Sequence, residues 1–161
     1  MVQVQYFGRP GDEALTATLN RNRPSRLHCP TPLGLRITVE YRVLPWAADA
    51  RQWVAQTAAY YYALTDEDRA SATLGSREIL AFHWHPEARG AFLDPHLHVG
   101  AAWLGGEARI SPKWHVPTGR VTLEEIIRFA IRHFDVKPMR GDFERVLTNT
   151  RAEVSVESNR L

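Results

Sequence analysis

The sequence predicts an α+β fold, in which an antiparallel sheet of about five strands packs against two C-terminal helices. In the middle of the chain, apolar residues alternate with polar ones, which is the period of half-buried strands. After residue 121 the apolar residues recur every three or four positions, which is the period of an amphipathic helix. The apolar sheet face needs a cover, and the helices supply one.

The 161 residues fit one domain by their number. We expect an N-terminal extension over 1–32, the sheet over 33–116 and a helical part over 121–156. Strands are expected at 2–6, 33–43, 52–64, 77–85, 96–103 and 108–115.

In three of these segments, particular residues bear on where the strand ends, whether it is a strand, or where it lies in the sheet. Pro45 is expected to end the strand that begins at Leu33, because proline cannot donate to a ladder hydrogen bond. Residues 52–64 are ambiguous, since their alanines allow a helix, but their aromatic and β-branched residues favour a strand. The strand over 108–115 is expected at a sheet edge because it contains Pro112.

Three helices are expected. A short one is predicted over 11–20. The second follows the apolar spacing from Leu123 to Phe134, which predicts that Ile127 and Ile131 are buried; Thr122 and Glu125 form a capping box at its start. The third begins after Asp142, beyond the helix-stopping Pro138.

Composition narrows the class of protein. The formal net charge is +2, which is too small to indicate nucleic-acid binding. Cys29 is the single cysteine, so an intramolecular disulfide is excluded and a reducing compartment is expected. The chain contains no apolar run of membrane-spanning length and does not begin like a signal peptide. We therefore expect a cytoplasmic protein with no membrane partner.

Four histidines form two alternating triplets, His83-Trp84-His85 and His96-Leu97-His98. Residues two apart in a strand share a face, so each pair points to one side, away from its apolar neighbours. The segment between the triplets is expected to be a hairpin loop. A hairpin symmetric about that loop would place His83 opposite His98 and His85 opposite His96, with all four imidazoles on one face.

Such a cluster suits three roles. Converging imidazoles can bind a divalent transition metal, with Glu87 or Asp94 adding a carboxylate. Without a metal, two histidines of opposite protonation state can catalyse RNA cleavage. The third interpretation gives these histidines only a structural role in packing between strands.

The basic residues nearest the cluster in the sequence are candidates for binding a substrate phosphate, because a cation stabilises the charge that develops there. His115 can add a fifth imidazole if its strand pairs beside the hairpin. The candidate substrate-binding residues are Arg89, Lys113, His115 and Arg120.

The segments HWHP, PHLHVG and PTGRVTLEEIIRF resemble the layout of the TumE-like small toxins of bacterial toxin–antitoxin loci. The matching residues are Pro95, His96, His98 and the helix start from Thr122 to Glu125, within a stretch that covers about a third of the chain. A second group of small uncharacterised bacterial proteins has a similar PH[LV]HV strand. The chain differs from the toxins in its N-terminal extension, its second C-terminal helix and its HWHP motif.

The toxin resemblance implies an antitoxin partner with a helix-turn-helix DNA-binding domain, and possible attack on RNA. The expected function is therefore that of a toxin-like component acting on RNA or a nucleotide, through His83, His85, His96 and His98. A small metal-binding hydrolase that uses the same histidines is the alternative. A non-catalytic partner-binding domain is the third possibility.

Overall fold

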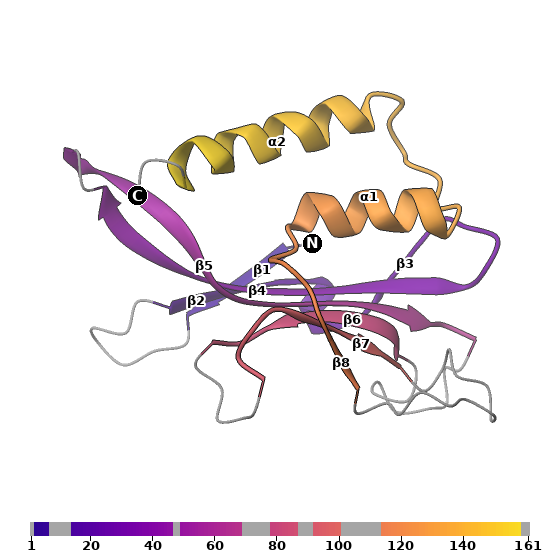
Figure 1. Cartoon of the computed structure of the whole chain (residues 1–161). Helices are drawn as coiled ribbons and strands as arrows, with labels where there is room; N and C mark the ends of the chain where they lie inside the picture. The colour runs from indigo at the N-terminus through magenta and orange to yellow at the C-terminus, as the bar shows by residue number, and fades with distance from the viewer. Residues whose placement is uncertain are drawn as a thin grey trace.

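The computed structural model describes residues 2–6, 14–46, 49–68, 78–86, 92–100 and 114–158, and it has an α+β architecture (Figure 1). The elements in chain order are β1 (Val2–Tyr6), β2 (Ala14–Leu19), the 3-10 turn η1 (Asn20–Asn22), β3 (Ser25–Arg26), β4 (Leu33–Trp46), β5 (Asp49–Asp66), β6 (Glu78–Trp84), β7 (His96–Val99), β8 (His115–Pro117), α1 (Leu123–His133) and α2 (Phe143–Ser158).

The strands form one antiparallel sheet in the order β1-β2-β4-β5-β6-β7-β8, and β3 pairs separately with β4. The sheet has more than the expected five strands because the N-terminal segment, besides the expected β1, adds β2 and β3. The helix predicted over 11–20 is therefore wrong where the structure describes it. Ala14–Leu19 is a strand that pairs with β1 on one side and β4 on the other, and this pairing outweighs the local helical preference.

The central strands agree better with the sequence. The choice of strand for 52–64 is confirmed, because β5 covers that whole segment. Pro45 does not end β4, which continues to Trp46 across a register shift next to the proline; such an irregularity accommodates a residue that has no N–H. The predicted strand over 108–115 lies outside the described residues except for its last two positions, and β8 starts at His115.

One face of the sheet carries the main core, and α1 covers it. The side chains of Tyr60 and Tyr62 stack on each other, with ring centroids 4.8 Å apart, and they pack with Leu64 and Trp84 against Ile126 of α1. Tyr60 also accepts a hydrogen bond from the Val121 N–H, at 2.9 Å. This bond fixes the chain where it enters α1.

The second helix packs on the first. Arg128 and Arg132 of α1 both form ion pairs with Glu144 of α2, at 2.9 and 2.8 Å. The sheet, α1 and α2 lie in that order, with both helices on the same side of the sheet (Figure 1). In the described part of the chain, no helix has the length and apolar character needed to cross a membrane.

The predicted start of α1 is confirmed, but its predicted buried face is wrong by one position. Thr122 and Glu125 form the reciprocal capping box. The fully buried positions are Ile126 and Ala130, whereas Ile127 and Ile131 are only partly buried. Because Ile126 and Ile127 are adjacent, the apolar spacing does not show which of the two faces the sheet. The packing of Phe129 against Phe82 orients the helix so that Ile126 does.

We predict that Ile126→Ala lowers the free energy of unfolding by about 2–5 kcal/mol, because it removes a fully buried side chain from the helix–sheet contact. Ile127→Ala is the matched control, with the same change one residue away on a partly exposed face, and it should cost clearly less. Urea unfolding followed by circular dichroism measures both. Equal losses in the two variants would contradict this assignment of the buried face.

Candidate metal centre

The histidines are displayed by three neighbouring strands at one end of the sheet. Along β6, Phe82 and Trp84 pack on the α1 side, so His83 between them points to the opposite face. The strand register pairs His83 directly with His96 of β7, and His98 of β7 with His115 of β8. Strand alternation and pairing therefore bring these imidazoles together on the face that the helices leave uncovered.

The observed pairing differs from the expected one by two residues. His83 lies opposite His96, and His98 lies opposite Ala81, so the predicted pairs are wrong. Gly100 explains the register: its N–H donates to the Ile79 carbonyl at 2.7 Å, and a Cβ there would lie 1.8 Å from the Glu78 oxygen. A shift of two residues keeps every side chain on its face, so the predicted shared face exists although its pairing was wrong.

Three of the four predicted histidines converge. One ring nitrogen from each of His83, His96 and His98 lies within 4.8 Å of the other two. The rings of His83 and His98 are nearly parallel, with centroids 4.3 Å apart. This stacking is possible because the residue opposite His98 is the small Ala81. We call His83, His96 and His98 the histidine trio.

The trio is held in a form suited to metal binding. His96 is only 7% exposed, and its Nδ1 lies 2.7 Å from the Asp94 carbonyl oxygen. A carbonyl only accepts hydrogen bonds, so Nδ1 carries the proton and Nε2 offers a lone pair. Metal-ligating histidines are commonly oriented by such a bond. The Nε2 atoms of His83 and His98 are buried and have no hydrogen-bond partner among the described residues.

Burial keeps two imidazoles of the trio neutral. Burial, followed by the neighbouring histidines, lowers the pKa of His83 to about 3. The same causes lower the pKa of His98 to about 4. Burial and the nearby His96 also lower the pKa of His115. At neutral pH His83 and His98 therefore present lone pairs, which is the state that a metal ligand requires.

The other site residues expected from the sequence do not belong to the trio. The His85 ring is 5.9 Å from that of His83, and His85 is not part of the trio. His115 lies beside the trio, with its ring 4.2 Å from His98 and 4.8 Å from His96. The Arg120 guanidinium lies over the ring of Trp84, on the α1 side of the sheet, because Trp84 belongs to the core there. Of the other candidates, Glu87, Arg89 and Lys113 lie outside the described residues.

Two neighbours of the cluster are not evident from the histidine pattern of the sequence. Phe92 is about half exposed, and its ring lies 4.1 Å from that of His115, so it borders the site. Tyr61 packs edge-on against His83, with ring centroids 4.6 Å apart, and its hydroxyl donates to the carboxylate of Glu78. The tyrosine run gave a signal for Tyr61, since its middle member must face away from Tyr60 and Tyr62.

We predict that the metal-free protein loses stability as the pH falls from 7 to 5. The pKa of His83 in the folded protein is below its value of about 6.5 in the unfolded chain. Below pH 6.5 the unfolded chain therefore binds a proton at His83 that the folded protein does not. The free energy of unfolding thus falls as the pH is lowered from 6.5 towards the pKa of His83 in the folded protein. With a chelator present, His83→Gln should reduce the fall in melting temperature by roughly 4–8 °C. His133 is exposed, and His133→Gln serves as the control. Its melting temperature should fall with pH as much as that of the wild type.

Neither the protein-family models, nor the curated proteins, nor the solved structures contain a match to this chain. The TumE-like resemblance therefore stays a prediction.

Proposed function

We propose that this protein binds a divalent transition metal ion through the histidine trio and uses it for hydrolysis. The observation that carries the proposal is the convergence of three ring nitrogens within 4.8 Å. Three imidazoles with an open fourth position are a known arrangement for catalytic zinc. A bound ion of this kind lowers the pKa of a coordinated water to about 7 and so supplies hydroxide at neutral pH.

The surroundings of the trio support a catalytic rather than a purely structural ion. A structural zinc site is closed by four protein ligands, whereas three histidines converge among the described residues. His115 lies next to the trio without joining it, and its Nδ1 is buried with no partner in the described part of the chain. In the proposed site, His115 hydrogen-bonds to a water or substrate at the open position.

The same electrostatics weigh against the metal-free alternative. RNA cleavage by a histidine pair needs one imidazolium and one neutral imidazole at the working pH. His83 and His98 have pKa values lowered to about 3 and about 4, so neither is an imidazolium that can act as the general acid near pH 7. A metal ion removes this requirement, since it stabilises negative charge without proton transfer.

We predict that the purified protein binds one equivalent of Zn²⁺. His83→Ala, His96→Ala and His98→Ala should each weaken this binding by at least about 100-fold, because each removes one of only three ligands. His85→Ala is the matched control, two residues from His83 and just beyond the end of β6, and it should stay within about threefold of wild type. Competition with a chromophoric chelator measures the affinities, and Co²⁺ spectra report the coordination geometry.

For the proposal to hold, the three trio variants must bind Zn²⁺ much more weakly than His85→Ala does. If His85→Ala weakens binding as much as the trio variants, the assigned ligands are wrong. If the wild type binds no stoichiometric metal while circular dichroism shows it folded, the cluster is structural.

The toxin-like function implied by the sequence resemblance has its own test. If the trio attacks RNA in cells, expression of wild type in bacteria should arrest growth and degrade RNA. Loss of a metal ligand or of a general base removes about 10²–10⁴-fold in rate, so His96→Ala should be harmless while remaining folded. Equal toxicity would exclude His96 from the mechanism. Absence of toxicity from either protein would leave a metal-dependent hydrolase with another substrate.

A further inference from the structure

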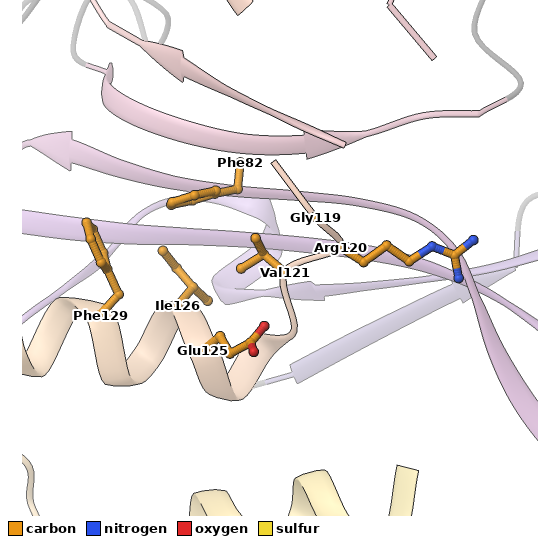
Figure 2. A pocket seen from close by; sticks show the side chains of 7 residues that line it. All are labelled: Phe82, Gly119, Arg120, Val121, Glu125, Ile126 and Phe129. Atoms are coloured by element: carbon orange, nitrogen blue, oxygen red, sulfur yellow. The ribbon is translucent and has the colours of Figure 1, made fainter. Parts of the chain in front are cut away.

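A second site lies on the opposite face of the sheet. Between β6, α1 and the segment that joins β8 to α1 there is a hollow of about 330 Å³. Figure 2 shows the apolar side chains of Phe82, Val121 and Ile126 pointing toward one another, with Phe129 beside them, while Arg120 extends to one side. The hollow is separated from the histidine trio by the sheet itself.

The hollow is open to solvent and mostly apolar. Ile126 lies beneath it and has no exposed surface, so the partly exposed side chains Phe82, Val121 and Phe129 form the apolar wall that a ligand can reach. A volume near 300 Å³ with mostly apolar walls is typical of a small-molecule site.

The charge at the edge of the hollow indicates what kind of molecule fits. The Arg120 guanidinium lies 3.9 Å from the centre of the Trp84 ring, a stacked geometry that holds it in place, to one side of the apolar side chains (Figure 2). The other charged lining residue, Glu125, accepts the Thr122 N–H at 2.9 Å and so serves the helix cap.

We propose that this hollow binds a small carboxylic acid with a hydrocarbon chain of about eight carbons. The chain lies along Phe82, Val121 and Phe129, and the carboxylate pairs with Arg120, whose planar fork suits two carboxylate oxygens. At roughly 30 Å³ for each non-hydrogen atom, the volume of a liquid water molecule, the hollow takes about ten such atoms. Octanoate has that number.

Gly119 allows the hollow to be blocked without disturbing the fold. It lines the hollow, and a Cβ added to it meets no heavy atom within 4 Å. Gly119→Leu should therefore extend a side chain into open space and exclude a ligand. Arg120→Gln removes the charge while keeping a side chain of similar length over Trp84.

The test is titration of octanoate into the metal-free protein by calorimetry, with 1-octanol and octylammonium as matched chains with other head groups. We expect octanoate to bind with a dissociation constant of about 0.1–1 mM. Arg120→Gln should weaken it at least tenfold, because a charge-assisted hydrogen bond contributes about 1.5–3 kcal/mol, and should leave octanol unchanged. Gly119→Leu should abolish binding of both.

Three results would overturn the proposal. One is no octanoate binding at 10 mM, roughly ten times the weakest dissociation constant expected. Another is binding that Gly119→Leu leaves intact in a protein shown to be folded by circular dichroism. The third is tighter binding of octylammonium than of octanoate. His83→Ala should bind octanoate like wild type, so this test is independent of the metal proposal.

Discussion

The pairing of β6 with β7 is the constraint on which both faces of the molecule depend. Each strand gives alternate residues to opposite sides, so one pairing places Phe82 and Leu97 towards the helices and His83 and His96 away from them. A slip of one residue would exchange the two sets. Gly100 opposes such a slip, because no residue with a Cβ fits where its backbone approaches Glu78.

Burial keeps two histidines of the trio in the neutral form. Four imidazoles close together would repel one another if protonated, and removal from water adds to the cost of charging them. Both effects act in the same direction and keep His83 and His98 neutral. The protein thereby holds lone pairs on buried nitrogens that lack partners in the described part of the chain, at the expense of stability in acid.

The chain from β8 to the start of α1 connects the two faces. His115, the first residue of β8, belongs to the histidine face, and Arg120, five residues later, lies over Trp84 on the helix face. Two hydrogen bonds fix the residues between β8 and α1: the Thr118 N–H donates to the Pro95 carbonyl, and the Val121 N–H donates to the Tyr60 hydroxyl. Arg120 is therefore near His115 in the sequence but lies on the other side of the sheet.

The sequence by itself determined those features that depend on local period and local hydrogen bonding. Strand alternation was sufficient to predict that His83, His96 and His98 share a face, because that face is the same for any register shifted by two. The capping box was readable because Thr122 and Glu125 are three residues apart. The strand at 52–64 followed from its β-branched and aromatic residues.

Tertiary structure decided what depends on distant partners. Only the Gly100 contact with β6 showed that His83 faces His96, which leaves His85 outside the trio. Only the pairing of β2 with β1 and β4 made residues 14–19 a strand rather than a helix. The choice of Ile126 over Ile127 as the buried residue was likewise made by the packing of Phe129 on the sheet. In each case the local sequence is compatible with two solutions, and contacts between residues far apart in the sequence selected one of them.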